Sequence, residues 1–204
     1  MPALLKRLAG PRTCPIVVAQ YKDEYRGVGH EADLHWALVV ITDRATLSGP
    51  SFQAGQGAER ESEYEVQWYA RHAPASLYDV CATVRTLCLG GVQVGAVRAA
   101  DVGKLAEYLQ SHPPAPTHAG WSSRDYVLEL LELLRPFKML REDLQRLDVR
   151  RGRAGAESGR GGWRGTGSGT VEVGDLLPEL REVGRATQES IFNEEFRPCV
   201  KYCP

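Results

Sequence analysis

The sequence has no long hydrophobic run. Its longest apolar stretch, around residues 37–41, is far shorter than the roughly 20 residues that a membrane-spanning helix needs. The apolar stretch near the N-terminus is too short and too interrupted for a secretory signal. With several basic and no acidic residues before Asp23, this N-terminal segment faintly resembles a transit peptide. We favour the interpretation that it forms one turn of helix before Pro11. We therefore expect a soluble, cytoplasmic protein without a membrane partner.

An excess of charge of either sign is also missing. The chain has 25 Lys and Arg residues against 26 Asp and Glu residues, a formal net charge of -1 at pH 7. This balance gives no whole-molecule field that would attract nucleic acid or an anionic membrane. Any basic patch must therefore be local, and we expect the partner to be a protein or a small-molecule ligand rather than a nucleic acid.

Cysteines are few and scattered. There are five, an odd number, and the closest pair, Cys199 and Cys203, lacks the second pair that a structural zinc site needs. Without a secretion signal, these residues predict reduced thiols in a reducing compartment. His30, His112 and His118 have no ligand spacing either. The sequence therefore predicts neither a metal site nor a cofactor.

What is present predicts the strands of an α+β domain. Residues 16–21 and 35–42 are β-branched and apolar, as buried strands are. Residues 63–70 alternate polar and apolar side chains, the pattern of a half-buried strand. Residues 81–89 and 92–97 predict a further strand pair that turns at Gly90-Gly91, a dipeptide suited to positive φ.

Helices are expected after these strands. Asp101 is placed to cap a helix that ends before the prolines at 113–116. Ser122 or Ser123 begins a longer helix with a broad apolar stripe, which Pro136 ends or kinks. A last amphipathic helix is expected at residues 175–192, where it packs back on the domain.

The segment before that last helix has a different composition. Residues 150–169 are dominated by glycine and arginine, so ordering them would cost entropy with little burial in return, and we expect disorder. One Arg-Gly-Gly unit begins at Arg160 and could contact single-stranded RNA. Because RNA-binding segments usually repeat the unit many times, a flexible linker is the favoured interpretation.

Two residues invite a catalytic interpretation. His35 opens a buried strand, and Ser123 opens a buried helix. A helix N-terminus gathers free N–H groups and positive dipole, which stabilise a nucleophile's anion and a developing oxyanion. A histidine on a neighbouring strand could act as the base. The alternative is structural, because serines that cap helices and histidines at strand ends are much commoner than catalytic sets.

Several segments together resemble, in order, a fungal domain family of unknown function. They are His35-Trp36-Ala37-Leu38-Val39-Val40, residues 64–74, residues 87–97, residues 101–109 and Gly120-Trp121-Ser122-Ser123-Arg124-Asp125-Tyr126-Val127. The resemblance covers about residues 16–135. That family looks like the permuted branch of the NlpC-type papain-fold hydrolases, which includes the lecithin retinol acyltransferases. The resemblance implies a papain-like fold, with a small antiparallel sheet packed against helices.

The same resemblance assigns roles to residues. His35 matches the catalytic histidine, Ser123 stands where the family has its cysteine, and His72 is the candidate for the orienting position. Trp36 and Trp121 are the candidates for substrate contact. Serine is a weaker nucleophile than a cysteine thiolate, so we expect a catalytically degenerate or weak relative of these hydrolases and acyltransferases. A non-enzymatic protein-interaction module and a weak RNA binder are the alternatives.

The expected organisation follows from these assignments. Residues 1–15 form an N-terminal extension, and residues 16–149 form the papain-like α+β domain. Residues 150–170 are the disordered Arg/Gly-rich insert, and residues 171–204 hold the C-terminal amphipathic helix and tail.

Overall fold

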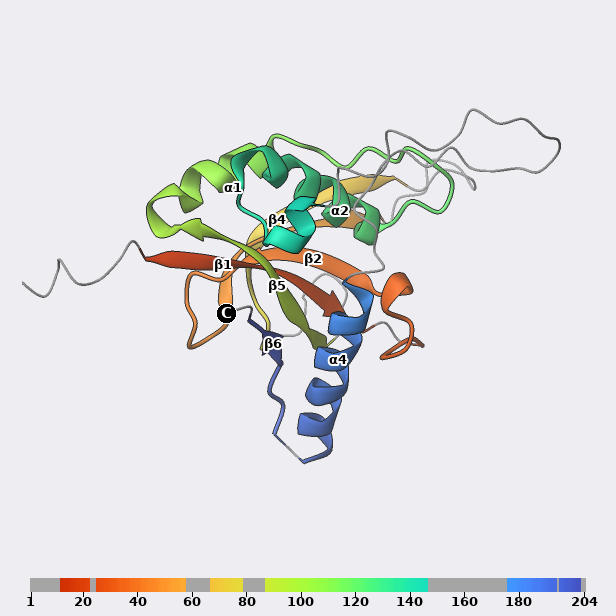
Figure 1. The fold of residues 1–204 in the computed structure, drawn as a ribbon. Coiled ribbons are helices and arrows are strands. Elements are labelled where there is room, and N and C mark those ends of the chain that lie inside the picture. The colour runs from red at the N-terminus through yellow and green to blue at the C-terminus, as the bar shows by residue number, and fades with distance from the viewer. Residues whose placement is uncertain are drawn as a thin grey trace, which may run out of the picture.

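The computed structural model describes residues 12–22, 25–57, 67–78, 87–146, 176–193 and 195–202. Within them the chain forms a mixed α and β structure with a six-stranded sheet (Figure 1). This confirms the predicted α+β class. The Arg/Gly-rich segment, the N-terminal residues 1–11 and Cys203 lie outside the described residues, so the predictions made for them stay predictions.

The sheet places the first strand in its middle. The strands are β1 (Thr13–Tyr21), β2 (His35–Val40), β3 (Ser48–Gln56), β4 (Trp68–Ser76), β5 (Cys88–Arg98) and β6 (Val200–Lys201). Their order across the sheet is β4-β3-β2-β1-β5-β6. Neighbours are antiparallel except β5 and β6, which are parallel.

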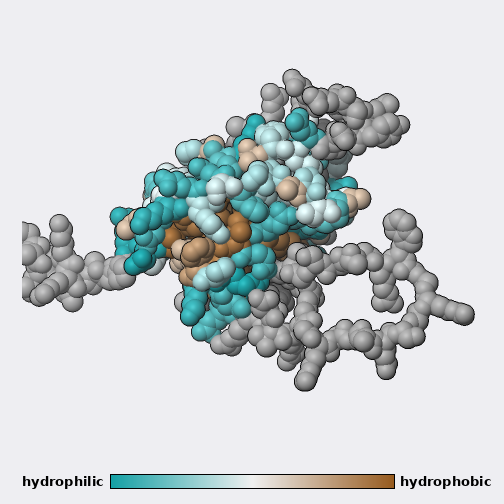
Figure 2. Space-filling model, turned by 90° about the horizontal axis from the view of Figure 1, so that it is seen from above, coloured by the Kyte–Doolittle hydropathy of each residue, from teal (hydrophilic) through white to brown (hydrophobic). Residues whose placement is uncertain are grey.

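The helices gather on one face of this sheet. They are α1 (Val102–Gln110), α2 (Ser123–Leu134), α3 (Glu142–Arg146) and α4 (Leu177–Phe192). Figure 1 shows α1 and α2 above the sheet and α4 beside β5 and β6. The buried stripe of α2 includes Leu130 and Leu131, both fully inaccessible to solvent, as the sequence predicted. Seen from the side of α1 and α2, hydrophobic residues gather at the centre of the molecule and hydrophilic ones surround them (Figure 2).

Strand alternation divides the core between the two faces. Successive side chains of a strand point to opposite sides of the sheet. Ile16, Val18 and Trp36 therefore share a cluster with the helices. Val17 and Ala19 lie in a second cluster on the other face, which loop residues such as Leu47 and Leu77 help to form.

The predicted turn at Gly90-Gly91 is wrong. Both glycines lie inside the single strand β5, beside an irregularity in its pairing with β1. Gly90 does have a positive φ of 94°. A Cβ at this position would also clash with the carbonyl oxygen of Cys199. Glycine is needed here for a bulge and for the close approach of the C-terminal tail, not for a hairpin turn.

One other local prediction needs correction. Asp101 stands at the N-cap position of α1, but its side chain makes no capping bond and instead accepts a hydrogen bond from Arg98 Nε at 2.6 Å. The strand expected at residues 63–70 is confirmed at Trp68–Ala70 and continues to Ser76 as β4, while residues 63–66 lie outside the described residues. The α-helix before Pro136 ends at Leu134, as expected, and one turn of 3-10 helix, Arg135–Phe137, follows it.

None of the described helices has the length and apolar character needed to cross a membrane.

Candidate functional site

The N-terminus of α2 is built by a capping box. Ser122 is the N-cap residue, and Asp125 is its partner three residues later. The Ser122 N–H and hydroxyl both donate to Asp125 Oδ2, each at 2.8 Å. The sequence left open whether Ser122 or Ser123 caps the helix. The structure assigns that role to Ser122, which leaves the hydroxyl of Ser123 for another partner.

That partner is the backbone of the neighbouring strand. The N–H of Trp36 donates to Ser123 Oγ at 3.1 Å, and only 5% of the Ser123 surface is exposed. The bond joins two residues 87 positions apart in the chain. It fixes the beginning of α2 against the beginning of β2.

His35 has different surroundings. Its Nε2 lies 2.7 Å from Gln53 Oε1, and its ring lies 6.0 Å from the Tyr21 ring, centroid to centroid. Burial lowers the pKa of His35, the hydrogen bond with Gln53 partly opposes this, and the positive charge of Arg71 lowers it further. The imidazole is therefore neutral at pH 7.

His35 and Ser123 approach from opposite sides of the sheet. Trp36 belongs to the helix-covered cluster, so the preceding residue, His35, points to the other face, where Tyr21 also lies. Strands β2 and β3 pair only at Leu38↔Phe52 and Val39↔Ser51. Beyond these pairs lies a pocket of about 370 Å³, and both His35 and Ser123 line it. The structure thus brings the two residues to one pocket but gives their side chains separate hydrogen-bond partners.

His72 is not placed behind His35. It lies on β4 opposite Phe52, and the two rings are 5.5 Å apart on the helix-covered face. Both of its ring nitrogens are buried and have no hydrogen-bond partner among the described residues. Burial lowers the pKa of His72. The described contacts therefore give His72 no orienting role toward His35.

The two candidate substrate-contact tryptophans lie in the core. Trp36 is fully buried, and its indole N–H donates to the Glu31 carbonyl at 2.8 Å. Trp121 is 5% exposed, packs edge-on against Trp68 with centroids 4.8 Å apart, and donates to Glu129 Oε1 at 2.9 Å. The aromatic residue that lines the pocket beside Ser123 on this face is Trp68.

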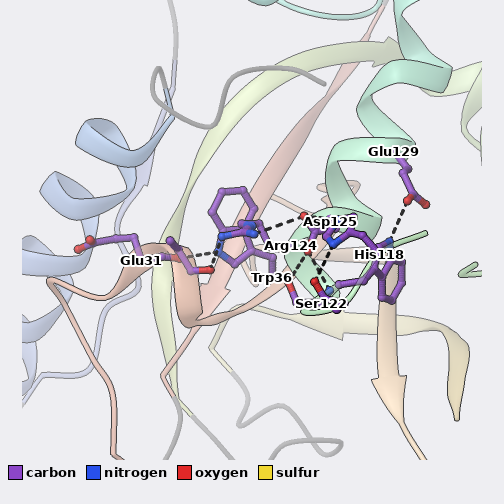
Figure 3. Close-up of polar contacts among 10 residues, drawn as sticks. Glu31, Trp36, His118, Ser122, Arg124, Asp125 and Glu129 are labelled. Carbon is purple, nitrogen blue, oxygen red and sulfur yellow. Dashed lines mark hydrogen bonds and ion pairs between the residues drawn. The ribbon is translucent and has the colours of Figure 1, made fainter. Parts of the chain in front are cut away.

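Glu31 is a central polar residue that the sequence did not indicate. Its side chain extends toward α4 (Figure 3), where Arg181 Nε and Nη2 donate to Oε2 at 3.2 and 3.0 Å. The Gly29 N–H donates to Oε1 at 2.6 Å. Burial would raise the pKa of Glu31, but the bonds from Arg181 and Gly29 outweigh it, so the pKa is lowered. The carboxylate therefore stays charged and holds α4 on the domain.

A further contact extends this network to α2. Arg124 Nη1 donates to the carbonyl oxygen of Ala32 at 3.0 Å, and its Nη2 lies 3.4 Å from Asp125 Oδ1 (Figure 3). His118 Nε2 lies 4.0 Å from the same carboxylate oxygen. These bonds connect α2 with the loop before β2, so the polar residues around Ser123 serve to assemble the domain. Within the described ranges, no group of three His, Cys, Asp or Glu residues is placed to hold a metal ion.

Comparison with known proteins does not add a family to this geometry. No family model, curated protein or solved structure matches the chain. The resemblance to permuted papain-fold proteins therefore stays a prediction from the sequence, and the function must be argued from the contacts.

Proposed function

We propose that the protein is a non-enzymatic binding module, a relative of papain-fold hydrolases that has lost its catalytic site. The observation that carries this proposal is the bond between the Trp36 N–H and Ser123 Oγ, at 3.1 Å. A catalytic serine must present its oxygen to a substrate and have a base within hydrogen-bond reach. Ser123 instead uses its oxygen to hold α2 on the sheet.

The hydrogen bond of His35 supports the same conclusion. A ring nitrogen that bonds to an amide oxygen donates its hydrogen, and His35 Nε2 lies 2.7 Å from Gln53 Oε1. This nitrogen therefore cannot accept a proton from Ser123. The other ring nitrogen, Nδ1, could accept one, but the contacts of the described residues include no hydrogen bond between it and Ser123, whose oxygen accepts from the Trp36 N–H. Both side chains thus serve as cross-links, His35 between two strands and Ser123 between a strand and α2.

The test is the acidity of a thiol at position 123. In Ser123→Cys, the rate of iodoacetamide alkylation is followed against pH by mass spectrometry of the peptide that carries the new cysteine. The matched control is the double variant Ser123→Cys/His35→Ala. We expect the same thiol pKa in both, since the His35 ring lies on the other face of the sheet. A pKa well below the ordinary value of about 8.5 that rises when His35 is removed would overturn the proposal.

A weak hydrolase or acyltransferase is the second candidate, because His35 and Ser123 line one pocket. In that case His35 is the base through Nδ1, Ser123 is the nucleophile, and Gln53 rather than His72 is the orienting residue, since its Oε1 lies 2.7 Å from His35 Nε2. An activated ester such as p-nitrophenyl acetate distinguishes the two candidates. Hydrolysis by the wild type that is abolished in Ser123→Ala, with the exposed His30→Ala as a surface control, would favour the enzyme.

Two of the described cysteines support a cytoplasmic location for this module. Cys14 and Cys199 form no disulfide among the described residues, and such thiols are typical of reducing compartments. Contact of the Arg/Gly-rich segment with RNA remains a separate prediction from composition.

A further inference from the structure

A larger hollow lies away from the pocket of Ser123. It has a volume of about 970 Å³, and it lies between β3, β4, the loop before β3 and the last turns of α1. Its walls include Pro50, His72, Pro74, Tyr78, Ala106 and Gln110. Ligand sites are commonly concave, mostly apolar and about this size, with a few polar groups that select the ligand.

The described walls of the hollow carry no charged side chain. Among the described residues that line it there is no Lys, Arg, Asp or Glu. A charged ligand would lose hydration here and find no opposite charge in exchange. The neutral lining therefore favours an uncharged occupant.

Most hydroxyl groups around the hollow are already bonded to the protein. Ser51 Oγ donates to the Ala73 carbonyl at 2.8 Å, and Ser76 Oγ donates to the Thr46 carbonyl at 2.7 Å. Thr46 Oγ1 and Ser48 Oγ lie 2.7 Å apart. These bonds join the loop before β3 to β3 and β4, so this wall of the hollow is preformed. Its bonded hydroxyls are therefore not the groups that we expect to bind a ligand.

His72 differs from these residues. Its Nδ1 and Nε2 are buried without a partner among the described residues, although a neutral imidazole has one donor and one acceptor. Leaving such groups unpaired costs stability. Phenylalanine at this position would keep the ring packed on Phe52 without that cost. The polar ring is therefore unexplained by packing, and it lies in the wall of the hollow.

We propose that this hollow binds an uncharged organic molecule with an apolar body and a carboxamide group, which pairs with an imidazole nitrogen of His72. Both nitrogens are shielded from solvent in the structure, so binding requires the ring to turn about its Cβ–Cγ bond until one of them faces the hollow. The proposal rests on the proposed function of a binding module and names the chemical class of its ligand.

Three isosteric probes test the proposal: benzamide, benzoate and benzamidinium. They share size and shape but are neutral, negative and positive at pH 7.5. We expect benzamide to shift the NMR signals of the His72 ring and the Ala106 methyl group in a saturable way, and to bind at least tenfold more tightly than either ion. Equal binding of all three probes, or no saturable shift with benzamide, would overturn the proposal.

Variants identify the site of binding. His72→Phe keeps the ring and removes the nitrogens, so benzamide should bind at least tenfold more weakly, whereas His118→Phe, at an exposed position outside the hollow, should change nothing. Gln110 is exposed and lines the hollow, so the larger side chain of Gln110→Trp should also block benzamide binding. This variant provides the test if His72→Phe does not fold. Unchanged affinity in a folded variant of His72 or Gln110 would refute the assignment. The outcome is independent of the thiol titration at position 123, which tests the proposed function.

Discussion

Removing the hydroxyl of Ser123 is the sharpest test of its structural role. In Ser123→Ala, the buried N–H of Trp36 loses its acceptor, and an unsatisfied buried donor costs about 1–3 kcal/mol. Alanine is the better helix former by at most about 0.5 kcal/mol, and this gain offsets part of the loss. We therefore expect the free energy of unfolding to fall by about 0.5–2.5 kcal/mol.

The sign of this change distinguishes the two functions. Catalytic residues are often held at the expense of stability, so replacing one is commonly neutral or stabilising. The measurement is equilibrium urea unfolding followed by fluorescence and circular dichroism, with the same m-value required of both proteins. His35→Ala combined with Ser123→Ala should be additive within about 0.5 kcal/mol, because the two side chains share no bond. A variant as stable as the wild type, or more stable, would refute the structural role of Ser123.

Three further predictions concern the core and the charges. Leu130→Asp should unfold the domain, since an unpaired carboxylate in this fully buried position costs several kcal/mol, and an unchanged melting temperature would count against it. Burial lowers the pKa of His35, so the unfolded chain takes up its proton first, near about pH 6.5. When the pH is lowered from 7.5 to 5.5, the urea concentration at the unfolding midpoint should therefore decrease more in the wild type than in His35→Phe; equal decreases would contradict the prediction. Arg181→Ala removes the partner of Glu31 and should speed amide exchange throughout α4, whereas Arg185→Ala, exposed one turn later, should not; equal rates would exclude a docking role.

Local patterns predicted the elements whose stability is decided locally. The apolar period of α2 is confirmed at Leu130 and Leu131. The continuous apolar run at residues 16–21 is confirmed as a buried strand, with Val17 and Val18 in the clusters on opposite faces of the sheet. The helix end near Pro136 follows from the missing N–H and fixed φ of proline. These features depend on neighbours a few residues away, which the sequence displays directly.

The missed features depend on distant partners. Glu31 and Arg181 are 150 positions apart, and no local pattern connects them. Gly90 has the backbone freedom that the sequence indicated, but its use in a bulge depends on the tail at Cys199. The placement of His35 depends on which face of the sheet carries the helices, and a shift of one residue along a strand reverses the face. Motif order therefore could not determine whether His35 and Ser123 meet.

The central position of β1 has a consequence for synthesis on the ribosome. This strand emerges before the other described strands and can pair with β2 early, but its other edge needs β5, which ends at Arg98. Between Tyr21 and Arg98 the ribosome adds 98 − 21 = 77 residues, which takes roughly 4–15 s at about 5–20 residues per second. During that time an apolar strand edge stays open to other nascent chains. A chaperone that binds extended apolar segments could therefore protect β1 during this interval.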